Sequence, residues 1–509
     1  MKLPAYLAAQ AQLLPNKAAL VCGENRVTFR QLHEDSSRIA TYLRNSGINV
    51  GDRIAICLPN CCEFVTIFFA IVQCGAIAMP INMRLSSSEI SAIIKDAQPA
   101  ALFFSDSERE AVAKLDPAGF QRFFVGETSI PGETSLATLL GTQIEQIDVP
   151  PECDDCMISY TSGTTGRPKG VITTQANYIV ANGFLNATYW RVSADDRILV
   201  TTPLAHRTAF ARVGNMAVLG ATLYIMPRFD AEEATRIIEA EQITLISIVP
   251  TVGRMMLPSI EASSDRYRSL RVLVATGEAF PVEAKRRLMA ALPHLQIFSF
   301  FAMTEAGALA MLQPHDQLKY SSSVGRVTPG VELRLVNEAG EPVRTGEAGE
   351  IWVRSGLPGQ YLLFRTYFRQ PDAIRDAFQN GWFKTGDIGR FDEEGYLYIV
   401  DRKKDMVLSG GYNVYSKEVE LVLLRHPGVA DAAVIGVPDE IYGESVAAFV
   451  ELDPGAAVSA DALIQRCAEE LASYKKPKHV VFVRELPKNS TGKVLKTELR
   501  SAFKKPQIV

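Results

Sequence analysis

The chain has few cysteines, and that shortage excludes one class of protein. Eight cysteines in 509 residues do not form a disulfide framework of the kind that stabilises small secreted proteins. Cys61 and Cys62 fall in an apolar region and are interpreted as buried thiols in a reducing compartment. Cys153 and Cys156 have CxxC spacing, but no second pair or histidine cluster accompanies them. A zinc site is therefore not expected.

Long apolar runs are also absent. The most apolar stretch, residues 64–79, is short and is interrupted by Gln73 and Gly75, which favours a buried helix over a membrane span. The opening MKLPAYLAAQAQ has a weak apolar run broken by Pro4, so an amphipathic helix is preferred to a secretory signal. We expect a cytoplasmic protein without stable membrane insertion.

Neither sign of charge dominates. The chain has 53 Lys and Arg against 57 Asp and Glu, a formal net charge of −4. That balance gives no general attraction to nucleic acid, and no nucleic-acid partner is expected. A hydrophobic content of 47% with 22% charged residues is ordinary for a globular protein. A chain of 509 residues is too long for one core, so two or more domains are expected.

One stretch concentrates small and hydroxyl-bearing residues around a lysine: residues 160–170, YTSGTTGRPKG. Glycines turn tightly and approach a ligand closely, while hydroxyls and backbone N–H groups form a concave donor surface suited to phosphate. Lys169 adds a positive charge. Strand-like runs flank the stretch, at residues 157–160 and 171–173. These features predict a loop around a nucleotide polyphosphate rather than a solvated linker. It differs from the common P-loop, since a proline precedes the lysine and a glycine follows it.

Apolar strands alternate with helices over most of the chain, which predicts parallel β-α-β units and an α/β fold. Ligands of such sheets collect beyond the carboxyl ends of strands, here after Val249, Ala275 and Phe301. From Val331 onward, short strands with glycine-rich turns indicate a small antiparallel β-subdomain. The charged stretch 401–405, DRKKD, is interpreted as a linker, followed by a small α+β domain. We expect a large domain at 1–401 and a mobile one at 402–509.

The loop, together with the order of the motifs that follow it, resembles the adenylate-forming superfamily over nearly the whole chain. That superfamily contains acyl- and aryl-CoA synthetases, adenylation domains of peptide synthetases and firefly luciferase. The resemblance implies that ATP binds to residues from several segments. These are Thr161, Ser162, Gly163, Thr164, Thr165, Gly166 and Lys169 for the phosphates, Gly277, Glu278 and Phe301 for adenine, Asp387 for the ribose, and Arg402 for the ribose or phosphate.

The segment FAMTE at 301–305 follows a strand and resembles the superfamily's Tyr-Gly-x-Thr-Glu motif. The resemblance implies that Glu305 is the Mg²⁺ ligand and that Thr304 contacts the α-phosphate. From the residues alone, Thr-Glu is also a good helix start. Phe301 replaces the usual tyrosine and Ala302 the usual glycine, and the added methyl group is expected to narrow the acid pocket.

Lys493 lies in a Ser/Thr/Gly turn, a setting in which lysines are usually exposed. The resemblance implies that it enters the active site for adenylation only, bridging the attacking carboxylate and the phosphate. Lys404 would be the hinge of the mobile domain, and Gly410 and Gly411 would line the passage for the pantetheine arm of CoA.

The segment PLAHRTAF at 203–210 resembles the part of the superfamily that lies against the acid substrate, with His206 in the matching position. Its neighbour Arg207 is expected to face solvent rather than to bind a second carboxylate. Four apolar side chains are expected to line the acid pocket, namely Phe210, Met255, Phe280 and Phe301. They favour a medium-chain, aromatic or alicyclic acid.

The predicted function is an ATP-dependent acid–CoA ligase with ATP, Mg²⁺ and CoA. A carboxylic acid and ATP give acyl-AMP and pyrophosphate, and CoA then displaces AMP. The first alternative is an adenylating enzyme that loads a carrier protein in trans. The second is a luciferase-like oxygenase, and the third is a nucleotide-binding protein without catalysis. The sequence leaves open whether the chain forms a homodimer.

Overall fold

The computed structural model describes residues 2–83, 85–115, 119–126, 130–161, 168–277, 280–410, 412–488 and 494–503. The chain forms two compact units: residues 1–332 with 353–383, and residues 333–352 with 384–509. The boundary expected between residues 401 and 402 and the hinge expected near Lys404 concern a mobile domain, and they stay predictions.

The larger unit contains a nine-stranded sheet in the order β16-β15-β14-β13-β12-β10-β11-β1-β2. Neighbouring strands from β14 to β1 run parallel, and the edge strands β15, β16 and β2 are antiparallel to their neighbours. The strands are β1 (Ala18–Cys22), β2 (Asn25–Thr28), β10 (Arg197–Val200), β11 (Thr222–Ile225), β12 (Leu245–Ile248), β13 (Val272–Thr276), β14 (Gln296–Met303), β15 (Gly307–Leu312) and β16 (Arg326–Val327).

A second sheet of the larger unit has eight strands in the order β19-β9-β8-β4-β3-β5-β6-β7. It is parallel from β8 to β7, and β8, β9 and β19 are antiparallel to one another in turn. The strands are β3 (Arg53–Cys57), β4 (Ile77–Pro80), β5 (Ala101–Phe104), β6 (Gln121–Phe124), β7 (Thr134–Ser135), β8 (Asp155–Thr161), β9 (Lys169–Thr174) and β19 (Thr366–Tyr367).

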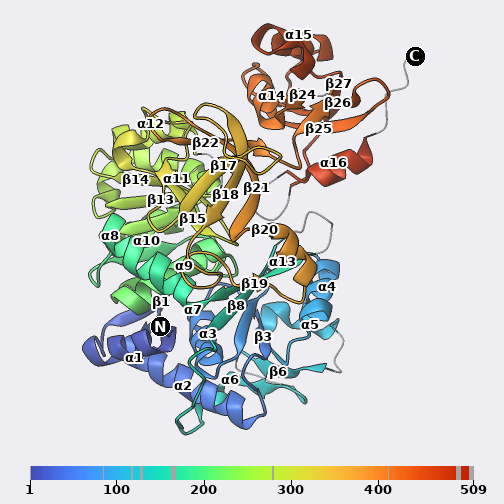
Figure 1. The fold of residues 1–509 in the computed structure, drawn as a ribbon. Coiled ribbons are helices and arrows are strands. Elements are labelled where there is room, and N and C mark those ends of the chain that lie inside the picture. The colour runs from blue at the N-terminus through green and yellow to red at the C-terminus, as the bar shows by residue number, and fades with distance from the viewer. Residues whose placement is uncertain are drawn as a thin grey trace. The chain divides into compact units, whose positions relative to one another are not determined.

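Helices cover both faces of these two sheets (Figure 1). One hydrophobic core joins the sheets through α3 (Cys62–Gln73) and α9 (Arg207–Leu219). The far face of the nine-stranded sheet packs on α10 (Ala231–Ala240), α11 (Pro250–Ala262) and α12 (Val282–Ala291). The far face of the other sheet packs on α4 (Ser87–Ala97) and α5 (Arg109–Ala113). Because both faces are covered, the parallel strands are apolar almost throughout, as predicted.

The remaining helices of the larger unit lie along its edges and between its strands. They are α1 (Leu3–Leu13), α2 (Phe29–Asn45), α6 (Leu136–Leu140), α7 (Gln175–Tyr178), α8 (Asn186–Tyr189) and α13 (Pro371–Ala377). A π-helical segment, Ile179–Leu185, joins α7 to α8 and packs against α9. The apolar stretch at 64–79 contains the expected buried helix, α3, which is buried almost throughout, and ends in strand β4.

A third sheet has the order β17-β18-β21-β20, with β22 paired to β21. Strands β20, β21 and β22 are antiparallel, in agreement with the predicted subdomain. Their bounds are β17 (Glu332–Val336), β18 (Ala348–Arg354), β20 (Phe378–Gln379), β21 (Trp382–Phe391) and β22 (Leu397–Arg402).

The end of the smaller unit is an α+β fold, as predicted. Its sheet has the order β24-β23-β26-β25, with β27 paired to β26, and helices pack on both faces. The elements are β23 (Val407–Ser409), β24 (Tyr412–Val414), α14 (Ser416–Leu423), β25 (Val429–Asp439), β26 (Gly443–Leu452), α15 (Ala460–Glu470), β27 (His479–Val483) and α16 (Lys496–Ala502).

The interpretation of residues 401–405 as a linker is wrong. Asp401 and Arg402 end strand β22, and Asp401 and Asp405 are both buried. Asp401 accepts hydrogen bonds from the backbone N–H and the hydroxyl of Ser416 at the start of α14. Asp401, whose charge suggested exposure to solvent, therefore fixes the end of β22 to the start of α14.

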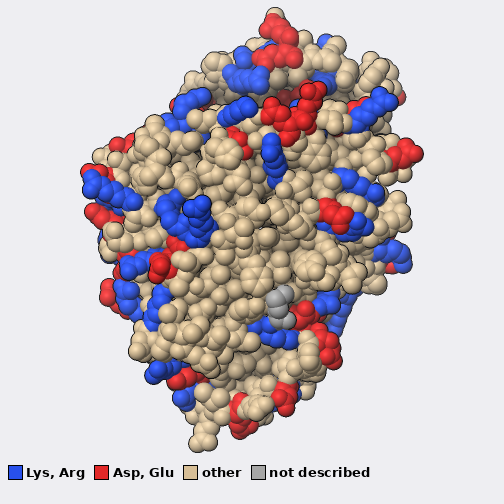
Figure 2. Space-filling model, turned by 60° about the vertical axis from the view of Figure 1, so that its left-hand side comes forward, with Lys and Arg blue, Asp and Glu red and all other residues tan. Residues whose placement is uncertain are grey.

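Surface charge is mixed in sign. Lys and Arg side chains are interspersed with Asp and Glu on the face shown in Figure 2, and much of that face is uncharged. Within the described ranges, no helix has both the length and the apolar character needed to cross a bilayer.

Gly325 gives a test of the packing next to β16. Its φ is +93°, and a Cβ atom there would lie 2.0 Å from the backbone of Met311. Gly330 has a similar φ of +84°, but a Cβ atom there would meet nothing within 4 Å. We expect Gly330→Ala to destabilise the protein by about 1 kcal/mol through the left-handed backbone alone. In Gly325→Ala, the new methyl group also overpacks against the backbone of Met311. We expect a total destabilisation of about 3 kcal/mol or more.

Thermal melting of the two variants measures this difference. A clearly lower melting temperature for Gly325→Ala than for Gly330→Ala is expected, and equal melting temperatures would contradict the packing described.

Candidate active site

The predicted phosphate loop closes a hairpin. Strands β8 and β9 are antiparallel, and their last pair is Thr161 with Lys169. The predicted flanking strands are therefore confirmed, and Thr161 and Lys169 mark the two ends of the loop. Ser162, Gly163, Thr164, Thr165 and Gly166 lie outside the described residues, so their phosphate contacts stay a prediction.

Thr304 and Glu305 lie in the tight turn that joins β14 to β15. Met303 pairs with Gly307 across this turn, and the ladder shifts by one residue beside Phe301 and Ala302. Such bulges re-aim side chains and are frequent next to active sites. Gly307 has φ +65°, a conformation that side chains disfavour. The segment is thus a tight turn at the end of a strand, with a glycine at its left-handed position, and not the start of a helix.

Arg207, the first residue of α9, fixes this turn. Its Nη1 donates to the carbonyl of Thr304, and its Nη2 donates to the carbonyl of Leu362 at 3.3 Å. The prediction that Arg207 faces solvent is wrong, because the guanidinium is turned inward over the ring of Tyr178. Burial lowers the pKa of Arg207 below its ordinary value, while Tyr178 and Glu305 oppose that shift. Two backbone carbonyls, rather than a second carboxylate, are its partners here.

Glu305 is held by the segment that contains β19. The backbone N–H of Phe364 donates to the Glu305 carbonyl at 2.7 Å, and the Tyr367 hydroxyl donates to Oε1 at 3.3 Å. Burial, and then the negative charge of Glu305, raise the pKa of Tyr367 well above its usual range, so the hydroxyl keeps its proton. The Lys169 ammonium lies 5.0 Å from the centre of the Tyr367 ring. Tyr367 thus connects the lysine of the phosphate loop to the carboxylate of the turn.

His206 precedes Arg207 in the chain, as the residue before α9. Its Nε2 is 3.2 Å from the side-chain nitrogen of Asn82, which follows strand β4. Phe301, near the end of β14, is half-buried. Gly277 follows β13 with φ +99°, which favours glycine at this position. Glu278 lies outside the described residues. The structure therefore brings Arg207 to the turn, while the place of His206 against the acid and the contacts of Gly277 and Phe301 with adenine stay predictions.

The expected apolar lining of the acid pocket is partly wrong. Phe210 is fully buried in the core, 4.5 Å from the ring of Phe68. Phe280 is buried on the far face of the nine-stranded sheet, and Met255 is exposed on α11. Of the four side chains proposed, Phe301 alone is half-buried at a strand end.

In the smaller unit, Asp387 and Arg402 form a pair across β21 and β22. Arg402 Nε lies 3.4 Å from Asp387 Oδ1, and the aspartate is buried. The Asp387 N–H donates to Thr385 Oγ1 at 3.1 Å, and the Thr385 hydroxyl donates to the carbonyl of Ile351 at 2.8 Å. These bonds fix a carboxylate and a guanidinium side by side, an arrangement suited to hydroxyl and phosphate groups.

Two further predicted segments belong to this unit. Gly410 joins β23 to β24 with φ +57°, and its N–H donates to the Tyr442 carbonyl at 2.9 Å. Gly411 and Lys493 lie outside the described residues. Lys488 and Val494, on either side of the Lys493 turn, pair as an antiparallel bridge. Burial lowers the pKa of Lys404, the expected hinge residue, below its ordinary value.

A magnesium ion fits the donor set at the turn. Among the described residues, no three His, Cys, Asp or Glu side chains are grouped as a metal cage. Mg²⁺ in nucleotide sites takes one or two carboxylates and completes its shell with phosphate and water oxygens. The single Glu305 carboxylate, oriented by Tyr367, meets that requirement.

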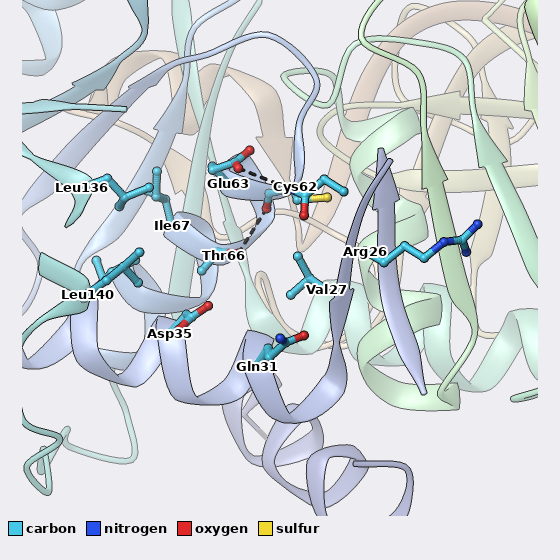
Figure 3. A pocket seen from close by; sticks show the side chains of 12 residues that line it. Arg26, Val27, Gln31, Asp35, Cys62, Glu63, Thr66, Ile67, Leu136 and Leu140 are labelled. Atoms are coloured by element: carbon cyan, nitrogen blue, oxygen red, sulfur yellow. Dashed lines mark hydrogen bonds between the residues drawn. The ribbon is translucent and has the colours of Figure 1, made fainter. Parts of the chain in front are cut away.

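A pocket of about 250 Å³ lies apart from this turn, between β2, α2, α3 and α6 (Figure 3). The Thr66 hydroxyl, on the pocket wall, donates to the Cys62 carbonyl of its own helix at 3.2 Å. Burial raises the pKa of the Cys62 thiol to about 12, so this thiol is protonated and unreactive. The pocket contains none of the predicted site residues.

Functional residues that the sequence analysis missed are Tyr367 and Asn82, together with the positioning role of Arg207. Arg207 and Tyr367 act on Thr304 and Glu305 from segments far away in the chain. No local sequence pattern signals such contacts.

Comparison with known proteins identifies the family of this chain. Residues 7–368 match the family model of the AMP-binding enzyme, and residues 418–493 match that of the AMP-binding enzyme C-terminal domain. The long-chain-fatty-acid–CoA ligase FadD13 of Mycobacterium tuberculosis is 36% identical over 490 residues, covering 94% of this chain and 93% of that protein. The feruloyl-CoA synthase of an Amycolatopsis species is 35% identical over 499 residues, covering 97% of each.

Solved structures of the o-succinylbenzoate CoA synthetase MenE from Bacillus subtilis have the same fold. The complex with the acyl-adenylate intermediate OSB-AMP has a TM-score of 0.84 and 29% identity, covering 98% of each chain. The complex with ATP and magnesium ion has a TM-score of 0.83 and 29% identity, covering 97% of this chain and 98% of that one. The chain described here belongs to the family of AMP-binding, adenylate-forming enzymes.

Proposed function

We propose that the protein is an AMP-forming acid–CoA ligase. A carboxylate attacks the α-phosphate of ATP, giving acyl-AMP and pyrophosphate, and the CoA thiol then displaces AMP to form the thioester. The observation that carries the proposal is the Thr304–Glu305 turn, held by Arg207 and Tyr367 next to the lysine of the phosphate loop. Family membership over nearly the whole chain supports the same reaction.

Positioning and charge neutralisation explain how these residues promote adenylation. Lys169 and the loop hydroxyls hold the phosphates, Thr304 contacts the α-phosphate, and His206 lies against the acid. Glu305 holds Mg²⁺, which when bound offsets the negative charge of the phosphates. Because Arg207 and Tyr367 fix the turn in advance, little rearrangement remains for the reaction itself.

The smaller unit takes part in both steps. Asp387 binds the ribose and Arg402 the ribose or phosphate, and in the first step Lys493 stabilises the charge that builds up as the carboxylate attacks the α-phosphate. Rotation of residues 402–509 about Lys404 then withdraws Lys493 and presents Gly410 and Gly411 to CoA, a hinge motion. This cycle follows from the resemblance stated above. The proposed acid is medium-chain, aromatic or alicyclic.

Mass spectrometry of products from Mg·ATP and a pooled panel of carboxylic acids, with and without CoA, tests the activity. An acyl-CoA that appears only when CoA is present is the expected result, and it identifies the acid at once. Acyl-AMP that accumulates in spite of CoA would replace the proposal with carrier-protein loading. Absence of both products would refute adenylation of that panel.

Lys493→Ala separates the two half-reactions. We expect acyl-AMP formation to fall by about 10²-fold or more, because one preorganised charge at the transition state is removed. Thioester formation from supplied acyl-AMP should stay near the wild-type rate. Lys476→Ala, at an exposed lysine of the same unit, is the matched control. Equal losses in both half-reactions would show that Lys493 is structural.

Tyr367→Phe tests the orientation of Glu305. The variant keeps the ring beside Lys169 and removes the hydroxyl that donates to the carboxylate, a bond to a charged group worth about 1.5–3 kcal/mol. We expect kcat/KM for adenylation to fall about tenfold and the Mg²⁺ concentration for half-maximal rate to rise.

Tyr361→Phe serves as the control for that variant. Among the described residues, the Tyr361 hydroxyl accepts a hydrogen bond only from the side chain of its neighbour Gln360. A Tyr367→Phe enzyme with the wild-type Mg²⁺ dependence would remove Tyr367 from the positioning of Glu305.

A further inference from the structure

Arg212 is a buried cation that has no counter-ion among the residues that the structure describes. The side chain leaves α9 one and a half turns after Arg207 and is 4% exposed. Its Nε and Nη1 are buried, and neither forms a hydrogen bond with any residue that the structure describes. The guanidinium lies 4.7 Å from the centre of the Trp190 ring. Burial lowers the pKa of Arg212 to about 9, and no acidic group of the described ranges opposes this shift, so the side chain remains charged at neutral pH.

Other unpaired polar atoms belong to the two helical faces that meet at Arg212. Asn215, one turn further along α9, donates from Nδ2 to the Asn182 carbonyl, while its Oδ1 is buried and unpaired. On the opposing segment, Asn186 Nδ2 and Trp190 Nε1 are also buried and unpaired in the described structure. Residues four apart share one helix face, as do residues three apart. Donors outnumber acceptors in this group, which therefore suits an anion.

The group is connected through Trp190 and Phe300 to the Thr304–Glu305 turn. The Trp190 ring packs edge-on against Phe300, with centroids 5.3 Å apart. Phe300 precedes Phe301 on β14, the strand that ends at the Thr304–Glu305 turn, and both rings are half-buried. Arg212 lies five residues along α9 from Arg207, a rise of roughly 7 Å. Phe300 lies four residues along β14 from Thr304, a rise of roughly 13 Å. An acid of medium length spans a distance of this order between the Thr304–Glu305 turn and Arg212.

We propose that Arg212 binds a second anionic group at the far end of the acid substrate. The substrate class is then a dicarboxylic acid, or a carboxylic acid with an equivalent terminal anion, whose spacer lies against Trp190 and Phe300. The inference rests on the ligase function proposed above. It refines the medium-chain, aromatic or alicyclic class by adding a charge that the apolar side chains did not indicate.

The test compares acids that differ only in the terminal charge. The probes are dicarboxylic acids from glutaric to sebacic, the monomethyl ester of each, and the unsubstituted monoacids, with acyl-AMP and acyl-CoA measured by mass spectrometry. For the best length, we expect kcat/KM to be roughly 10- to 100-fold higher for the dicarboxylate than for its monoester, as a charge-assisted bond implies. Equal values at every length in the wild-type enzyme would overturn the inference.

Arg212→Met keeps the length of the side chain and removes the charge. In this variant we expect the ratio of kcat/KM for the dicarboxylate to kcat/KM for its monoester to fall to about one. In Arg212→Lys, the same ratio should lie between one and the wild-type value. Arg236→Met, at a surface arginine of α10 paired with Glu233, should keep the wild-type ratio. A wild-type ratio in folded Arg212→Met would also overturn the inference. If that variant does not fold, the comparison of acids in the wild-type enzyme decides.

The outcomes distinguish this inference from the ligase function. Adenylation of monoacids without any gain from the second carboxylate refutes the role of Arg212 and leaves the ligase intact. Absence of adenylation across the whole panel counts against both.

Discussion

The hydrogen bond from Arg207 to the carbonyl of Thr304 is the interaction on which the site depends. Helix α9 packs in the core between the two sheets, so the guanidinium at its first residue is fixed by that packing. A turn between two antiparallel strands would otherwise be free to change conformation. The second bond, to Leu362, and the bonds from Phe364 and Tyr367 to Glu305 make the turn part of the same rigid assembly. Preorganisation of this kind lowers the rearrangement needed for charge stabilisation.

The sequence was informative where a local pattern determines the structure. Buried parallel strands require continuous β-branched and apolar residues, so the alternation predicted the two α/β sheets. The strands that flank residues 162–167 were predicted for the same reason. Helix α9 was missed, since ten of its thirteen residues are buried and a helix buried on all sides has no amphipathic stripe. Arg207 and residues 401–405 were misjudged because charge suggests solvent, and partners such as Ser416 are distant in sequence.

Helix α9 carries two arginines, one half-buried and one buried, in opposite states. Arg207 donates hydrogen bonds to two carbonyls, whereas Arg212 has a ring for a neighbour and no acceptor in the described structure. A cation over a desolvated aromatic ring gains about 2 kcal/mol. The effective penalty for taking an ion out of water is several kcal/mol. The Trp190 contact therefore offsets only part of the desolvation, and a counter-ion would remove the remainder.

The unpaired state of Arg212 determines how strongly the enzyme selects its acid. A pocket lined only by apolar groups distinguishes acids that differ by one methylene by about 10- to 200-fold. Phe300 and the Trp190 ring can supply this selection by shape. Arg212 adds selection by charge, because a monoester of the same shape would leave the desolvated guanidinium unpaired while a dicarboxylate would pair it. Selection by charge would then tolerate variation in the spacer, which contacts only apolar rings.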